Sequence, residues 1–217
     1  MEISKKGLLL VGDICTSNCN QKDKSTWPLL GDAVTATAFE YEEGNKGFKF
    51  QFETDGSGYD AIIIPEGGFR NPFSDESLKD SEIEPEIIRN NLNAILNGMD
   101  VFAFGISKRP QSVNKLAEHF QINKEEVDAF LFHQANLFMN EKIRKKLKVA
   151  VEKVPYSLRN FGNTSCASIP LTLVTEWREK LTDEKQHIIA CAFGVGLSWG
   201  SVYFETENII CSDLVEI

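Results

Sequence analysis

Short apolar runs separated by polar turns dominate the first quarter of the chain. Residues 7–14 form an apolar run, and residues 32–41 are rich in Val, Thr, Phe and Tyr. Both patterns predict β-strands, and the polar residues 15–28 between them predict a loop. Turn residues at 43–47 lead into residues 48–52, which alternate strictly between apolar and polar side chains. This order predicts a hairpin with one solvent-facing surface.

The middle of the chain changes from a polar segment to a helical pattern. Residues 65–85 contain three prolines, two glycines and many charges, so we expect a long loop or an internal boundary there. Apolar residues then recur at helical spacing over residues 86–121, and Gly105 and Pro110 should bend or break that helix. Residues 123–126 predict a capped helical turn, and residues 127–132 a strand.

The last third alternates helical and strand patterns. Residues 136–149 predict an amphipathic helix whose basic side is a solvated face or a docking surface for an acidic partner. Residues 163–165 can cap a helix that runs to residue 181, with an irregular start around Pro170. Residues 187–193 and 197–204 predict an antiparallel hairpin. The whole pattern is that of an α/β protein.

Composition excludes several classes of protein. The 217 residues are 42% hydrophobic and 25% charged, which is typical of a globular domain and argues against disorder. A net charge of −9 disfavours nucleic-acid binding, and no apolar run has the length of a membrane helix. The odd number of cysteines, five, favours reduced thiols in a cytoplasm. Cys15 and Cys19 lack a second ligand pair, so no metal site is predicted.

Three short strings are candidates for chemistry, and each also has a structural interpretation. The string FHQAN at 132–136 lies where a strand ends and a helix begins, so His133 is either at a ligand site or on an ordinary surface. Small and polar residues at 160–170 form a packed helix cap or let a ligand approach the backbone. Glycines at 192–200 form a hairpin turn or present N–H groups to an oxyanion.

Taken together and in this order, the strings resemble a known family. The run VFAF at 101–104, HQAN at 133–136, NTSCASIP at 163–170 and GVGLSWG at 194–200 resemble the carboxy-terminal part of 3-oxoacyl-acyl-carrier-protein synthase III, a thiolase-like ketosynthase. Residues 31–33 extend the resemblance more weakly toward the amino terminus. The family fold consists of two similar α/β halves, each with a mixed sheet and a buried helix.

The resemblance implies a set of site residues. His133 and Asn163 match the family's catalytic His and Asn, which hold a malonyl-carrier thioester carbonyl while carbon dioxide leaves and the carbanion attacks an acyl-cysteine. N–H donors aimed at a developing oxyanion lower such a barrier. Substrate contacts are expected from Asn136, Ala135, Phe193 and Val195. No cofactor or metal is expected; acyl-coenzyme A and a malonyl-carrier protein would be substrates.

Departures from the family pattern limit this interpretation. The family's nucleophilic Cys lies in its amino-terminal half, and none of the five cysteines here has that context; Cys166 matches a family Ala and is expected to be a small buried residue. Val195 replaces a Gly of the second oxyanion hole, which adds bulk. Phe138 replaces a basic residue used in docking the carrier.

The resemblance also predicts an organisation. Residues 1–85 would be the remnant of the amino-terminal half plus a connecting loop, and residues 86–217 the carboxy-terminal half. The strands at 7–14 and 32–41 would belong to the missing half's sheet and expose apolar faces. We therefore expect a cytoplasmic ketosynthase part that works with a Cys-bearing half or subunit, and with an acyl carrier protein. The alternative is a scaffold that supports a partner ketosynthase without turnover.

Overall fold

A four-stranded mixed sheet organises the chain, as a computed structural model that describes residues 4–216 shows. Its strand order is β3-β10-β9-β8; β8 runs parallel to β9, and the other neighbours are antiparallel. The alternating patterns predicted from the sequence supply these strands: β3 (Lys49–Thr54), β8 (Ala129–Phe132), β9 (Gln186–Gly194) and β10 (Ser198–Thr206). The predicted hairpin of the last two strands is confirmed, with Ser198 opposite Gly194.

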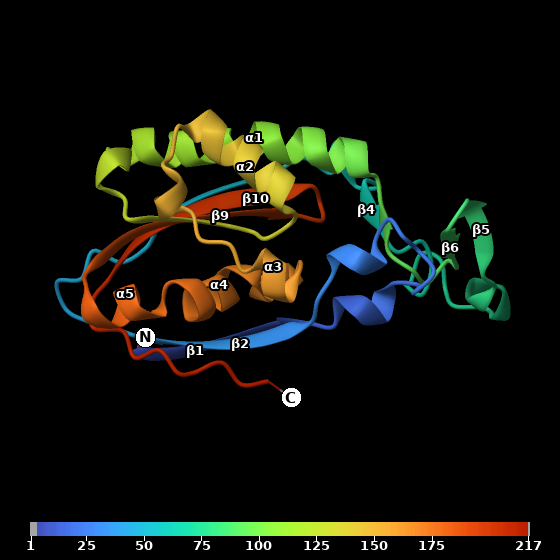
Figure 1. Ribbon diagram of the computed structural model, residues 1–217, viewed down its shortest axis with the longest axis horizontal. Helices are drawn as coiled ribbons and strands as arrows, with labels where there is room; N and C mark the ends of the chain where they lie inside the picture. Colours follow the sequence, from blue (N-terminus) through green and yellow to red (C-terminus); the bar gives the residue numbers. More distant parts are fainter. Residues whose placement is uncertain (1–3, 217) are drawn as a thin grey trace.

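Helices cover both faces of this sheet, which buries β8 on each side. The helices α1 (Gly98–His119) and α2 (Leu137–Leu147) lie on one face, above β9 and β10 in Figure 1. The shorter helices α3 (Leu158–Phe161), α4 (Ser168–Glu176) and α5 (Arg178–Asp183) lie on the other face. The larger core cluster joins α1 and α2 to the sheet, and a smaller one packs Trp177 and Leu181 beneath it.

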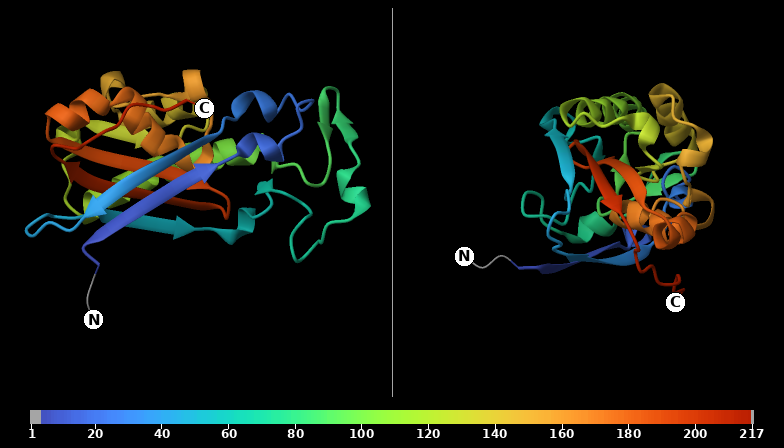
Figure 2. Two further views of the ribbon diagram at one scale, coloured as in Figure 1. Left: turned by 90° about the horizontal axis from the view of Figure 1, so that it is seen from below. Right: turned by 90° about the vertical axis from the view of Figure 1, so that its left-hand side faces the viewer.

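A two-stranded antiparallel sheet lies beyond the lower helices. It is formed by β1 (Lys6–Asp13) and β2 (Ala33–Glu40), which lie below the lower helices in Figure 1 and cross in front of the molecule in the left view of Figure 2. These two strands were predicted correctly. Their apolar side chains remain exposed: Leu8 and Leu10 are 65% exposed and Val34 is 75% exposed. The expectation that this part of the chain has uncovered apolar faces is therefore confirmed.

The hairpin predicted between residues 32–41 and 48–52 does not form. β2 pairs with β1, whereas β3 pairs with β10 and becomes an edge strand of the large sheet. The polar side chains of β3 also face the protein: Gln51 accepts a hydrogen bond from Ser112 of α1, and Glu53 pairs with Lys115. The apolar face of β3 is left outside, the reverse of what alternation alone suggests.

The helix predicted over 86–121 begins later than expected, at Gly98. Residues 62–97 instead form irregular chain with four short strands that extend away from the main body, at the right of Figure 1. These are β4 (Ile62–Ile63), β5 (Ser81–Glu84), β6 (Ile87–Arg89) and β7 (Ile95–Leu96). Asn90 and Asn93 form side-chain hydrogen bonds to backbone N–H groups, a turn that competes with helix in this segment.

Pro110 lies inside α1 without ending it, so of the two expected effects, a bend or a break, the break does not occur. A proline removes the N–H that would bond the carbonyl four residues earlier, here Ile106. Lys146 of α2 donates to that carbonyl at 3.3 Å, which supplies a replacement donor. Gly105 also stays helical, and a Cβ there would come within 2.7 Å of the Met139 sulfur, so its small size allows α1 and α2 to pack closely.

Candidate functional site

The first predicted catalytic residue, His133, directly follows β8. Its backbone N–H continues the sheet by donating to the Cys191 carbonyl of β9 at 3.0 Å. The next residues leave the strand, and Asn136 caps α2 with its side-chain oxygen on the Met139 N–H at 2.8 Å. The strand therefore fixes the backbone of His133, and the helix cap fixes the turn that follows it.

The imidazole of His133 lies among neutral partners. Its Nδ1 atom is 2.8 Å from the Ser168 hydroxyl at the start of α4, and the edge of the ring packs against Phe193. The backbone of Ser165 lies near the ring as well. Burial, and secondarily the charge of Arg109, lower the pKa of His133 to about 3. The ring is therefore neutral at pH 7, when it carries one N–H donor.

The second predicted catalytic residue, Asn163, is held by its backbone. Its N–H donates to the Leu29 carbonyl at 2.8 Å, and its carbonyl accepts from the Gly31 N–H at 3.0 Å. A Cβ on Gly31 would overlap the Phe161 carbonyl oxygen, and Gly162 has a φ of +64°. Both glycines are thus required where these two segments, far apart in sequence, run side by side.

Ser165 links the two predicted catalytic side chains. Its N–H donates to the Asn163 side-chain oxygen at 3.0 Å, and its backbone lies near the His133 ring. This hydrogen bond fixes the orientation of the Asn163 carboxamide, whose NH₂ group is the part that can donate to a ligand. His133 and Asn163 therefore come from separate segments and meet through one residue. Such a pair can donate hydrogen bonds to a single oxygen that gains negative charge.

A buried arginine lies behind His133. The Arg109 side chain of α1 is fully buried and donates to the His133 carbonyl and to the Asn140 side-chain oxygen, both at 2.9 Å. Asn140 in turn donates to the same His133 carbonyl at 3.3 Å. Burial lowers the pKa of Arg109 to about 10, which still leaves the guanidinium charged at neutral pH.

The four predicted substrate-binding residues have different surroundings. Phe193 is buried between His133 and Arg109, and Ala135 packs against the main core cluster. The Asn136 side-chain oxygen is used in capping α2, and its NH₂ group is the part left for a ligand. Val195 is 66% exposed in the turn between β9 and β10. Contacts of these residues with a substrate stay predictions.

Four of the five cysteines are poorly suited to act as a nucleophile. Burial, with Asp13 nearby, raises the pKa of Cys15 to about 12, and burial also raises the pKa of Cys19, Cys191 and Cys211. Cys166 is exposed, so the expectation that it is buried was wrong: it belongs to a short 3₁₀ turn whose Ala167 points inward instead. Within residues 4–216, no group of three Cys, His, Asp or Glu side chains could hold a metal ion.

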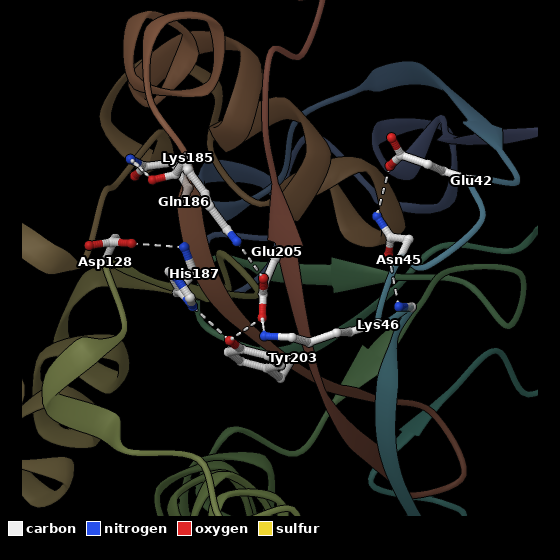
Figure 3. A network of polar contacts seen from close by, with 10 residues as sticks. Glu42, Asn45, Lys46, Asp128, Lys185, Gln186, His187, Tyr203 and Glu205 are labelled. Atoms are coloured by element: carbon white, nitrogen blue, oxygen red, sulfur yellow. Dashed lines mark hydrogen bonds and ion pairs between the residues drawn. The ribbon is translucent and has the colours of Figure 1, made fainter.

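A second polar cluster lies near the first residues of β9, away from His133. Figure 3 shows Glu205 between Lys46 and Lys185, and the His187 ring against the Tyr203 hydroxyl. The two lysines lower the pKa of Glu205 to about 2. The cluster borders a cavity of about 170 Å³ lined also by Lys49 and Glu126. Because its charges largely neutralise one another, we interpret it as a structural network that ties β3 and β10 to the loop before β8.

Sequence reasoning missed three residues that support the site. Ser165 and Ser168 were noted only as part of a small, polar string, since their contacts with His133 depend on the tertiary fold. Arg109 had a detectable signal: it is four residues before Val113 and seven before Leu116, on the apolar stripe of α1. A charged residue on a buried stripe indicates a specific partner in the core.

Comparisons with known proteins agree with the geometry. Residues 117–206 match the family described as 3-oxoacyl-[acyl-carrier-protein (ACP)] synthase III C terminal. The chain is 33% identical over 199 residues to a beta-ketoacyl-[acyl-carrier-protein] synthase III of Clostridium acetobutylicum. A crystal structure of a 3-oxoacyl-(acyl-carrier-protein) synthase III superposes on 93% of the chain with a TM-score of 0.87 and 32% identity. One from Burkholderia xenovorans LB400 superposes on 97% of it with a TM-score of 0.84 and 36% identity.

The matches cover almost all of this chain but only part of each relative. The chain spans 58% of the Clostridium protein, and 60% and 58% of the two solved chains. The predicted fold class, the carboxy-terminal thiolase-like half with the end of the amino-terminal half, is confirmed by these superpositions. No helix within residues 4–216 has both the length and the apolar character needed to cross a membrane.

Proposed function

The carboxy-terminal part of this chain belongs to the 3-oxoacyl-[acyl-carrier-protein] synthase III family, and from this premise we propose that the chain is part of a condensing enzyme. The reaction is a decarboxylative Claisen condensation of an acyl thioester with a malonyl-carrier thioester. The chain contributes the half of the site that binds the malonyl thioester, and the nucleophilic cysteine comes from a separate half or subunit. Fatty-acid or related acyl biosynthesis in the cytoplasm is the setting.

The convergence of His133 and Asn163 on Ser165 carries this proposal. The Asn163 amide donates to the thioester carbonyl oxygen, and the neutral imidazole of His133 donates a second hydrogen bond through Nε2. As carbon dioxide leaves, the electron pair of the broken C–C bond moves onto that oxygen as an enolate. Two fixed donors stabilise the enolate more than they stabilise the neutral carbonyl, so they lower the barrier.

The protonation and burial of the cysteine thiols in this chain support a nucleophile that comes from a partner half or subunit. A cysteine attacks as the thiolate, and a pKa of about 12 leaves Cys15 protonated at pH 7. Cys191 is buried in the middle of β9, opposite Ser201 of β10. The enolate carbon attacks the carbonyl of an acyl group held as a thioester on the partner's cysteine; the C–S bond breaks, and a thiolate leaves. No cofactor or metal is needed for this sequence of steps.

A non-catalytic partner subunit is the second candidate function. The exposed, bulky Val195 in the turn between β9 and β10 and the exposed Phe138 favour it, because the family has a glycine and a basic residue at these positions. The presence of both His133 and Asn163, joined through the backbone of Ser165, favours the enzyme, since a scaffold does not require this pair of side chains.

Decarboxylation of a malonyl thioester distinguishes the two candidates. The chain would be combined with a Cys-bearing half and a malonyl-carrier protein, and release of carbon dioxide would be measured. His133→Ala and Asn163→Ala should each reduce the rate by about 10²–10³, the usual effect of losing one oxyanion donor. His119→Ala, which changes an exposed histidine of α1, is the matched control and should keep the rate. Equal rates in all four proteins would favour the scaffold.

A further inference from the structure

Arg109 is a buried cation without a carboxylate partner. Within residues 4–216, no Asp or Glu forms an ion pair with it, although its side chain is fully excluded from solvent. Its guanidinium carbon instead lies 5.2 Å from the ring centre of Phe132 and 4.9 Å from that of Phe193. Burying a charge in this way is costly, so such a residue usually has a specific task.

Two side-chain hydrogen bonds connect Arg109 to His133, one directly and one through Asn140. One Nη atom donates to the His133 carbonyl, and the other to the Asn140 side-chain oxygen, each at 2.9 Å. Asn140 donates back to the same carbonyl, which closes a triangle of three groups. Phe193, which stacks on the guanidinium, also packs its ring against the imidazole. The arginine therefore holds the His133 backbone directly and supports Phe193, which packs against the imidazole.

We propose that Arg109 is a positioning residue that locks His133 in place and keeps its imidazole uncharged during the reaction. This inference rests on the proposed condensation and deepens it. An imidazolium is a much stronger acid than an imidazole and would transfer its proton to the enolate carbon. That transfer gives an acetyl thioester, so the malonyl unit loses carbon dioxide without forming a carbon–carbon bond. A neutral imidazole donates its hydrogen bond and leaves the enolate free to attack the acyl thioester.

The charges around this group come from three elements. Arg109 faces His133 from α1, and Cys191 of β9 lies beside the arginine with its thiol protonated, because burial raises its pKa. Tyr156, in the segment before α3, is also near Arg109; its pKa is raised, first by burial and then by its hydrogen bond to Glu141. Of these groups, Arg109 is the one whose charge lowers the pKa of His133, as the second cause after burial.

The test measures the titration of His133 directly, in the full chain. Nitrogen-15 NMR of the histidine ring would follow His133 in the wild type, Arg109→Met, Arg109→Lys and the control Lys115→Met, which changes an exposed lysine of the same helix. We expect the wild type and Lys115→Met to keep His133 neutral down to pH 5. Arg109→Met should raise its pKa toward the ordinary 6.5, and Arg109→Lys, which keeps the charge, should raise it less.

A second readout separates positioning from general stability. In the reconstituted enzyme, Arg109→Met should increase the ratio of acetyl thioester to condensation product several-fold, most at low pH. Should Arg109→Met fail to fold, Arg109→Lys carries the test, because it keeps charge but loses the two-pronged hydrogen bonding. An Arg109→Met protein that folds and titrates as the wild type does would overturn the proposal. Loss of turnover in every protein, with the titration shift still present, would instead refute the proposed condensation.

Discussion

At the scale of single residues, the site depends on a histidine kept neutral by its surroundings. The pKa of His133 is lowered to about 3 from an ordinary value of 6.5. The unfolded chain therefore binds a proton between these two pH values that the folded chain does not bind. Because protons bind preferentially to the unfolded chain, the free energy of unfolding is highest above pH 6.5. It falls as the pH drops below that value.

This difference gives a measurable pH dependence of stability. Between pH 6.5 and about pH 5, the free energy of unfolding should fall by about 1.5 kcal/mol because of His133. The His133→Asn variant should lose that part of the slope, and His119→Asn, at an exposed position of α1, should keep it. Urea unfolding at several pH values measures the effect. Parallel slopes in the wild type and His133→Asn would show that the histidine titrates normally in the folded chain.

The sequence predicted some residues of the candidate site and missed others. His133 and Asn163 were found because each lies in a distinctive string at a strand end or a helix start. The structure places both residues near Ser165, and their catalytic role stays a prediction. The support from Arg109 and Ser168 was not predicted, because a hydrogen bond between α1 and a strand end depends on how distant elements pack. No local pattern specifies that packing.

At the scale of elements, the site depends on a contact between two loops. The residues that follow the 3₁₀ turn Trp27–Leu29 form a parallel bridge with Asn163. Two backbone hydrogen bonds, at 2.8 and 3.0 Å, hold the two segments together. The same contact brings the end of the β1–β2 region against the loop before α4. Neither segment has a strand pattern of its own, so sequence periodicity gave no signal of it.

Gly31 is the position at which this contact can be broken most selectively. Gly31→Ala places a methyl group on the Phe161 carbonyl oxygen, so one segment must shift. Overpacking of this kind costs about 1–3 kcal/mol of unfolding free energy. Gly7→Ala is the matched control, because a Cβ there meets nothing within 4 Å. Thermal or urea unfolding compares the two, and equal stability would mean that the loops are not in close contact.

The errors in predicting elements have a common cause. The helical spacing at residues 86–96 was real, but Asn side chains bond to the backbone there and favour turns. The alternation at residues 48–52 was also real, and the strand formed, but with β10 rather than β2. A periodic pattern identifies an element and its two faces. It does not say which strand will be the partner or which face will be covered.

At the scale of the whole molecule, one apolar surface remains without a cover. Phe48, Phe50 and Phe52 stack along the outer face of β3 with ring centres 5.9 and 5.4 Å apart. Phe50 is 50% exposed and Phe52 is 72% exposed, and the leucines of β1 are uncovered as well. Soluble monomers rarely expose so continuous an apolar surface. This surface fits the proposal that a Cys-bearing half or subunit packs on the chain.

The oligomeric state of the purified chain tests that interpretation. An uncovered phenylalanine ladder should cause the chain to self-associate at micromolar concentration, because association removes apolar area from water. The double variant Phe50→Ser and Phe52→Ser should shift the chain toward monomer, measured by size-exclusion chromatography with light scattering. Val151→Ser, which changes an exposed apolar residue after α2, should not. A wild-type chain that stays monomeric and stable would indicate that these faces need no partner, and the proposed two-part enzyme would lose its main physical support.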